Sequence, residues 1–219
     1  MAGDNPVNEE SNIFDNRAAA WDDKPRRAKL AADVARAICN TVKITPEMDV
    51  LDFGCGTGLL TLRFQPLARS VTGIDSSKGM LAVLEEKIRE QKLPNVRARC
   101  IDMEKGEVPD GTYDLIVSSM TFHHIRDVQP VLAILSSLLK PAGTLAIADL
   151  DSDNGKFHDT PEGVFHNGFD RSIMKKHFET AGFVNIRNRT AAIVQKESPS
   201  GEIRPFTVFL MTGRKEMKG

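Results

Sequence analysis

The chain of 219 residues contains only three cysteines, Cys39, Cys55 and Cys100, scattered along its length. An odd number of scattered cysteines provides no disulfide framework and is typical of a reducing compartment. No apolar run approaches the roughly 20 residues that span a bilayer. The opening stretch MAGDNPVNEESN is polar and acidic, unlike a signal peptide. We therefore expect a cytoplasmic protein without a membrane span.

Net charge is also almost absent, because 29 basic residues balance 30 acidic ones to give −1. This balance provides no electrostatic basis for binding nucleic acid or an anionic membrane, which argues against nucleic acid as a partner. Hydrophobic residues make up 41% and charged residues 27% of the chain, as in ordinary globular proteins. The length suits a single domain with an ample core. The sequence does not distinguish a monomer from a homodimer.

The hydrophobic pattern alternates between strand-like and helix-like segments. The segment 26–43, for example, carries Leu30, Val34 and Ile38 on one helical face. The expected strands lie at 48–53, 70–75, 95–102, 113–120 and 144–150, and the expected helices at 26–43, 58–68, 76–91, 127–140 and 170–182. This alternation predicts an α/β fold with a parallel sheet and helices on both faces.

Two further β-like segments, 184–196 and 203–213, follow the last helix. No helical segment separates them, and the short connection between them would not allow parallel strands. The sheet is therefore expected to finish with an antiparallel pair.

A glycine-rich loop follows the first expected strand, within VLDFGCGTGLL at residues 50–60. Ligands of open parallel sheets bind beyond the carboxyl ends of the strands, so this loop is a candidate site. Leu59 stands where the dinucleotide fingerprint G-x-G-x-x-G has its third glycine. Asp52, just before the glycines, would repel a pyrophosphate but suits an ammonium or sulfonium group.

Two more carboxylates stand at the ends of the next two strands. Asp75 is positioned to accept hydrogen bonds from both hydroxyls of a ribose. Asp102 is positioned to accept from the exocyclic amine of adenine, while Met103 flanks the ring. A ligand with a cationic amino-acid end, a ribose and an adenine matches all three carboxylates. The sequence therefore predicts S-adenosylmethionine as the cofactor.

Five stretches, in this order and at this spacing, resemble the class I S-adenosylmethionine-dependent methyltransferases, particularly the type-11 branch near the ubiquinone-biosynthesis methyltransferases. They are VLDFGCGTGLLT, VTGIDSSKGML, ARCIDME, YDLIVSSMTFHHI and LLKPAGTLAIADLD, which together cover roughly residues 45–151. The resemblance implies a Rossmann-like fold with a seven-stranded, mostly parallel sheet and an antiparallel C-terminal pair. It also implies a lid in residues 1–45, a cofactor-binding core in 46–151 and a substrate-side part in 152–219.

The resemblance implies a set of cofactor-binding residues. The methionine end would meet Asp52 and the loop, the ribose Asp75 and Ser76, and the adenine Asp102 and Met103, with Ser119 under the sulfonium. The expected cofactor-binding residues are Asp52, Gly54, Cys55, Gly56, Gly58, Asp75, Ser76, Met80, Asp102, Met103, Ser118 and Ser119. Cys55 is interpreted as a small filler because the motif holds no partner base that would activate its thiol.

His123 and His124 follow the fourth expected strand. They serve either as packing or cofactor-contacting residues, or as the general base of an O- or N-methylation. The histidines do not have the tight spacing of a metal motif, so no metal is expected.

The acceptor pocket is expected to form from the N-terminal segment, His123 and His124, and the connection 151–170. Phe14 and Trp21 are either packing anchors or part of a lid that closes over the cofactor. In the connection, a mixed aromatic and polar pocket is suggested by Phe157, His158, Phe165, His166 and Phe169.

We therefore predict an enzyme that transfers a methyl group from S-adenosylmethionine to a small-molecule acceptor. The acceptor and the kind of atom methylated stay open. An NAD-dependent oxidoreductase on a related fold, or a regulatory protein that binds S-adenosylmethionine without turnover, are the alternatives.

Overall fold

A computed structural model describes residues 13–197 and 202–216 of the chain. The strands are β1 (Asp49–Phe53), β2 (Ser70–Asp75), β3 (Val96–Cys100), β4 (Tyr113–Ser119), β5 (Leu139–Leu150), β6 (Phe183–Glu197) and β7 (Ile203–Lys215). The helices are α1 (Pro25–Cys39), α2 (Thr61–Phe64), α3 (Lys78–Gln91), α4 (Val128–Leu138) and α5 (Arg171–Thr180), with 3₁₀ turns η1 (Asp15–Arg17), η2 (Met103–Lys105) and η3 (Phe122–His124).

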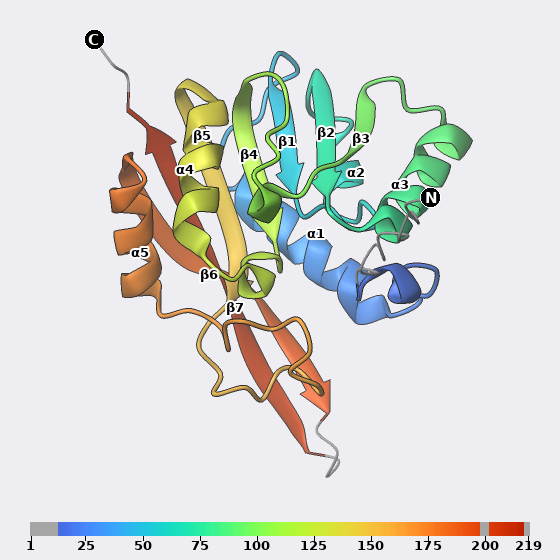
Figure 1. The fold of residues 1–219 in the computed structure, drawn as a ribbon, viewed down its shortest axis with the longest axis vertical. Helices are drawn as coiled ribbons and strands as arrows, with labels where there is room; N and C mark the ends of the chain where they lie inside the picture. The colour runs from blue at the N-terminus through green and yellow to red at the C-terminus, as the bar shows by residue number, and fades with distance from the viewer. Residues whose placement is uncertain (1–12, 198–201, 217–219) are drawn as a thin grey trace, which may run out of the picture.

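These strands form one seven-stranded sheet in the order β3-β2-β1-β4-β5-β7-β6 (Figure 1). Strands β1 to β5 are parallel, whereas β7 pairs antiparallel with both β5 and β6. The predicted Rossmann-like fold with an antiparallel C-terminal pair is confirmed. Since β1 to β5 point the same way, their carboxyl ends meet at one edge of the sheet.

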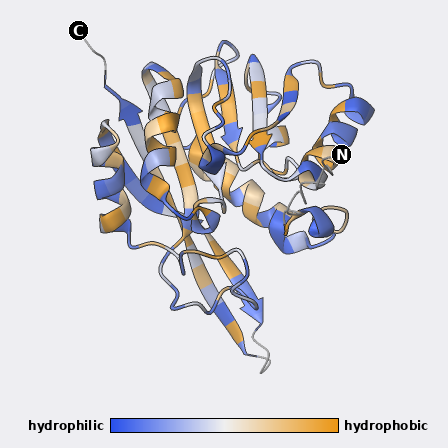
Figure 2. Ribbon diagram, in the orientation of Figure 1, coloured by the Kyte–Doolittle hydropathy of each residue, from blue (hydrophilic) through white to orange (hydrophobic). Residues whose placement is uncertain are grey.

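Both faces of the sheet are covered, because successive side chains of a strand point to opposite faces. Val50, Leu115 and Val208 pack with α1 and α2 on one face. Leu51, Ile116 and Phe209 pack with α4 and α5 on the other face. Figure 2 shows the central strands as mainly hydrophobic along their whole length, as strands buried on both faces should be.

Two local differences from the sequence pattern have plain backbone causes. The helix expected over 58–68 is shortened to Thr61–Phe64, because Gly58 adopts φ +85° and Pro66 has no N–H to continue the helix. The strand expected over 144–150 begins earlier, because β5 also includes residues 139–143, where Ala142 adopts φ +61°.

The far ends of β6 and β7 extend past the rest of the sheet, and the connection between β5 and α5 runs beside them (Figure 1). Lys196 of β6 donates to the carbonyl of Phe157 in that connection. The rings of Phe157 and Phe206 meet at 5.3 Å between centroids. The connection is therefore held over the carboxyl end of β5. Within the described ranges, no helix is long and apolar enough to cross a membrane.

We predict that Phe178→Ala destabilises the fold strongly, because Phe178 of α5 is 0% exposed and contacts the ring of Phe183. Removing a buried ring leaves a cavity, so the free energy of unfolding should fall by about 3–5 kcal/mol. Ile173→Ala on the same helix, where the side chain is 54% exposed, is the control and should cost less than about 1 kcal/mol. Urea unfolding measures both, and equal losses would contradict the packing of α5 described here.

Candidate cofactor and acceptor site

The glycine-rich loop after β1 is tied to the end of β2. The amides of Gly54 and Cys55 both donate to the carbonyl of Ile74, at 2.8 and 3.0 Å. Gly54 has φ +70°, and a Cβ there would lie 2.2 Å from Oγ1 of Thr121. Gly58 has φ +85°, and a Cβ there would lie 2.4 Å from Leu84. Glycine is therefore required at both positions by backbone conformation and by close packing.

Gly56, the middle glycine, differs from its two neighbours. Its φ is also positive, at +52°, but a Cβ added there would meet, among the described residues, only the sulfur of Met80, at 3.9 Å. The described residues therefore leave space beside Gly56. A backbone that faces open space at a strand end fits a ligand that approaches the main chain closely.

Asp75 links this loop to the start of α3. Its Oδ2 accepts from the amide of Gly56 and its Oδ1 from the amide of Ser77, both at 2.8 Å. Burial raises the pKa of Asp75, and the backbone N–H groups of Ser77, Gly56 and Ser76 partly offset this effect. A carboxylate has about four acceptor positions, so these three donors leave room for a hydrogen bond from a ligand.

Asp52 lies deeper, with 1% of its surface exposed. Its Oδ2 accepts a hydrogen bond of 2.6 Å from the hydroxyl of Thr61, the first residue of α2. Burial, together with the negative charge of Asp75, raises the pKa of Asp52 from 3.8 to about 7. A cation placed beside it would favour the ionised form.

The N-terminal segment is attached to this loop and to α3 at two points. Asp15 accepts from the hydroxyl of Ser77 at 2.5 Å and from the amide of Gly79 at 2.8 Å, so it adds a second carboxylate at the N-terminus of α3. A Cβ on Gly79 would lie 2.8 Å from the Cα of Asp15. The close contact between segment and helix depends on this glycine.

The second attachment point is Asp22. It accepts from the hydroxyl of Thr57 in the glycine loop at 2.7 Å, and it forms an ion pair with Lys87 of α3. Lys87 also donates to the carbonyl of Thr57 at 2.7 Å. Residues 15–22 therefore lie against the loop and the start of α3, with Trp21 covered by the guanidinium of Arg27 at 3.5 Å.

The expected adenine contacts lie after β3. Asp102 caps η2 by accepting from the amide of Glu104 at 3.1 Å, and Lys105 lies 3.4 Å from its Oδ2. Met103 is buried in the core cluster that α4 and α5 cover. Of this pair, the carboxylate is the more accessible group.

The remaining expected cofactor residues have different surroundings. Ser118 is buried and donates to the carbonyl of Phe53 at 2.8 Å, so its hydroxyl is already engaged. Ser119 is half-buried and Ser76 is exposed. Met80 is buried beside Gly56. Cys55 is buried against Leu84, and burial raises its pKa well above the ordinary value, which leaves an inert thiol.

His123 and Asp149 form a buried pair at the ends of β4 and β5. Nδ1 of His123 lies 2.6 Å from Oδ1 of Asp149, and the two side chains are 1% and 0% exposed. The backbone amides of His123 and Leu150 also point at this carboxylate, at 3.3 and 2.7 Å. Burial alone would raise the pKa of Asp149, but the charge and hydrogen bond of His123 outweigh it and hold this pKa below its ordinary value.

Two more imidazoles pack against His123. The ring centroid of His124 lies 4.0 Å away and that of His158 lies 4.9 Å away. Nδ1 of His124 donates to the carbonyl of Gly163 at 2.6 Å, and Nε2 of His158 is a buried nitrogen without a hydrogen-bond partner. Burial and the neighbouring His123 lower the pKa of both His124 and His158 to about 4, so both are neutral at pH 7.

The aromatic residues of the connection do not gather into one pocket as expected. Phe157 contacts His158, with 5.0 Å between ring centroids. Phe169 is buried in the core, and Phe165 is exposed beneath the guanidinium of Arg126 at 4.4 Å. His166 bonds to the carbonyl of Ile125. The N-terminal segment instead supplies an aromatic contact, because Phe14 meets His124 at 4.9 Å.

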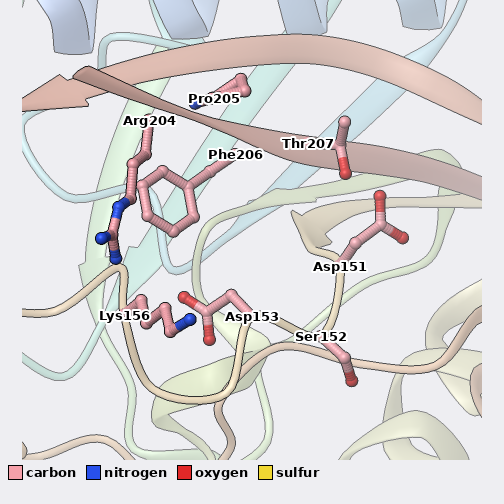
Figure 3. Close-up of a pocket in the computed structure, with 8 residues that line it drawn as sticks. All are labelled: Asp151, Ser152, Asp153, Lys156, Arg204, Pro205, Phe206 and Thr207. Carbon is pink, nitrogen blue, oxygen red and sulfur yellow. The ribbon is translucent and has the colours of Figure 1, made fainter. Parts of the chain in front are cut away.

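A pocket of about 320 Å³ lies between this connection and the start of β7 (Figure 3). Its lining residues are Asp151, Ser152, Asp153, Lys156, Arg204, Pro205, Phe206 and Thr207. Both carboxylates are already engaged, Asp151 by Arg171 and Asp153 by the amides of Gly155 and Phe157. Phe206, which lines the pocket, meets Phe157 edge to face, and Phe157 in turn meets His158 edge to face. In the part of the chain that the structure describes, no three His, Cys, Asp or Glu side chains form a group able to hold a metal ion.

Several of these residues escaped the sequence interpretation. Asp15 and Asp22 bond to partners 35 to 65 residues away, and no local pattern announces such contacts. Asp149 stands at a strand end, where ligand-binding residues collect, but only its contact with His123 gives it a chemical role.

Comparison with known proteins gives a consistent picture. Residues 50–143 match the model of a methyltransferase domain. An uncharacterized methyltransferase of Schizosaccharomyces pombe is 37% identical over 153 residues, which cover 63% of this chain and 54% of that protein. An uncharacterized methyltransferase of Bacillus cytotoxicus is 34% identical over 151 residues, which cover 62% of this chain and 69% of that protein. The chain thus spans about half the length of the Schizosaccharomyces pombe relative.

Among solved structures, phosphoethanolamine N-methyltransferase 2 of Haemonchus contortus, in complex with S-adenosyl-L-methionine, superposes with a TM-score of 0.67. The match covers 84% of this chain and 52% of that chain at 16% identity. This likeness concerns the fold.

The burial of Asp52 predicts a pH-dependent stability. Its carboxyl ionises near pH 4 in the unfolded chain but near pH 7 in the folded one, so stability is lost as the pH rises between these values. Asp52→Asn removes this loss and should raise the free energy of unfolding at pH 8 by about 1–4 kcal/mol, with little effect at pH 4. Urea titrations at both pH values measure it, and the exposed Asp110→Asn is the control. A pH-independent difference would contradict the assigned burial.

The contact at Gly79 predicts that Gly79→Val displaces the N-terminal segment. The new side chain would overlap the backbone of Asp15, so trypsin should cut faster after Arg17. Ala82→Val, at an exposed position of the same helix, is the control for the helix propensity of valine and should leave the cleavage rate unchanged. Equal cleavage of both variants would mean that the segment does not depend on this contact.

Proposed function

The chain belongs to the class I S-adenosylmethionine-dependent methyltransferases, in the type-11 branch, and we propose that it methylates a small-molecule acceptor. S-adenosylmethionine is its cofactor. The observation that carries the proposal is the space that the described residues leave at Gly56, whose amide is bonded to the carboxylate of Asp75. A cationic ligand with hydroxyl groups suits this combination of bare backbone and acceptor oxygens.

We assign the cofactor contacts as follows. Asp52 and the loop of Gly54, Cys55, Gly56 and Gly58 meet the methionine end. Asp75 and Ser76 hold the ribose, and Asp102 and Met103 the adenine. Met80, Ser118 and Ser119 complete the surroundings. The free lone pairs of Asp75 support the ribose assignment, whereas Ser118 and Met103 act from beneath the site, because their side chains are buried.

The bound cofactor supplies a methyl group already activated by a sulfonium, so the protein mainly has to orient the reactants, exclude water and remove a proton. The N-terminal segment serves as the lid in this proposal. Its ties through Asp15 and Asp22 to α3 and the glycine loop support this role. Phe14 extends the lid toward His124.

The acceptor side of the site is proposed to lie around His123 and His124, between the lid and the connection after β5. The Haemonchus contortus neighbour is named for methylating phosphoethanolamine, a small molecule, which supports an acceptor of this size. Membership of a methyltransferase family removes the grounds for the oxidoreductase alternative. The alternative of binding without turnover is decided by measuring release of S-adenosylhomocysteine.

Asp75→Ala should weaken the binding of S-adenosylhomocysteine at least about tenfold, which corresponds to about 1.4 kcal/mol, because two hydrogen-bond acceptors for the ribose are lost. Isothermal titration calorimetry measures the dissociation constant. Asp110→Ala, which removes an exposed carboxylate without a side-chain contact in the described structure, is the matched control and should bind as the wild type does. If the wild type binds neither S-adenosylmethionine nor S-adenosylhomocysteine, the proposed function is wrong.

A further inference from the structure

The buried pair of His123 and Asp149 has a defined proton arrangement. Oδ1 of Asp149 accepts from the amide of Leu150 and from Nδ1 of His123, so Nδ1 carries the proton. In its neutral form such a ring presents a lone pair at Nε2. Among the described residues, this nitrogen has no hydrogen-bond partner. The carboxylate therefore orients a proton acceptor and would stabilise the imidazolium that forms when the acceptor is used.

The groups around this ring carry no positive charge at neutral pH. His124 faces it from η3 and His158 from the connection, and both are neutral. Within the described part of the chain, the carboxylate that faces His123 is Asp149 of β5, and it is engaged by His123 itself. Beyond His158 lie Asp153 and Lys196; Asp153 is bonded to backbone amides and Lys196 pairs with Asp159.

This charge distribution selects among acceptors. An ammonium compound would find no free carboxylate here, and a carboxylate would find no cation to pair with. A neutral hydroxyl needs neither, and it can donate its hydrogen bond to an imidazole nitrogen. Among the described residues, the buried Nε2 of His158 also has no hydrogen-bond partner, and a buried polar atom without a partner is costly, so a polar group of a ligand or water fits beside it.

Building on the proposed function, on which this step rests, we propose that the acceptor is a neutral hydroxyl compound methylated on oxygen. His123 is the general base, Asp149 is its positioning residue, and His158 contacts the acceptor. The acceptor oxygen forms a bond to the methyl carbon while the carbon–sulfur bond breaks and leaves its electron pair on sulfur. The hydroxyl proton passes to Nε2 of His123. The products are a methyl ether, S-adenosylhomocysteine and a proton released from His123.

The choice of His123 over His124 follows from their partners. Both rings have a protonated Nδ1, but that of His124 faces the carbonyl of Gly163 and that of His123 faces a carboxylate. A carbonyl orients a ring without compensating the charge that appears when Nε2 takes up a proton, whereas a carboxylate does both.

The first test uses the wild-type protein labelled with ¹⁵N-histidine and needs no acceptor. Nitrogen chemical shifts should place the proton of His123 on Nδ1, and Asp149→Asn should shift the ring toward the Nε2–H tautomer. If the contact between His123 and Asp149 only held η3 against β5, the tautomer of His123 would not have to change in Asp149→Asn. A wild-type His123 with its proton on Nε2 would overturn the proposal.

The second test measures S-adenosylhomocysteine release with three sets of probes on the same ring: phenol and benzyl alcohol, aniline and benzylamine, and benzoate. Hydroxyl probes should be methylated fastest. His123→Gln should lower kcat for them about 100-fold or more with an unchanged KM for S-adenosylmethionine. His177→Gln on α5, where the ring contacts Gln129, is the control and should behave as the wild type does.

Binding of S-adenosylhomocysteine and thermal unfolding establish that each variant is folded. Faster turnover of the amines or benzoate, no turnover of the hydroxyl probes, or hydroxyl turnover that survives His123→Gln would each overturn this inference. If the protein still binds S-adenosylhomocysteine, those results contradict this inference but not the proposed methyl transfer. Loss of cofactor binding in the wild type would instead overturn the proposed function.

Discussion

The paired hydrogen bonds from Gly54 and Cys55 to the carbonyl of Ile74 are the contact on which the rest of this site depends. They turn the chain sharply at the end of β1 and hold the loop against the end of β2. At Gly54 and Gly58 of this loop, any side chain would collide with Thr121 and Leu84, respectively. Because the loop is held in this way, the amide of Gly56 reaches Asp75 and its outer surface stays open.

The carboxylates at this edge of the sheet illustrate three ways to bury negative charge. Asp75 is solvated by backbone N–H groups of the loop and of α3. Asp149 is matched by the imidazole of His123 and stays ionised. Asp52 is bonded by Thr61, but burial and the charge of Asp75 outweigh these hydrogen bonds, so its pKa is raised to about 7 and its ionised form costs stability until a cation binds. An arrangement that lowers the stability of the free protein can in this way favour a cationic ligand.

Two segments that lie far apart in the sequence cover the same edge of the sheet. The N-terminal segment crosses the glycine loop and reaches His124 through Phe14. The connection after β5 brings His158 against His123, and it is held in place by Lys196 and Phe206 of the long hairpin. The hairpin that extends beyond the sheet therefore has a structural purpose at the site, since it supports the segment that carries His158.

The sequence by itself determined which groups lie at one edge of the sheet. An apolar strand is followed by a loop with few side chains, and a carboxylate stands at each of three strand ends. Strand periodicity and glycine spacing are local properties, so Asp52, Gly56 and Asp75 could be recognised without coordinates. Only the tertiary structure shows that His123, and not His124, is bonded to a carboxylate, because Asp149 is 26 residues away in the sequence. It also separated Phe165 and Phe169 from the pocket that their spacing suggested, and it brought Asp15 to the start of α3 across 62 residues. The physical reason is that hydrogen bonds and burial between distant segments depend on how the chain packs, and no short pattern of residues encodes that packing.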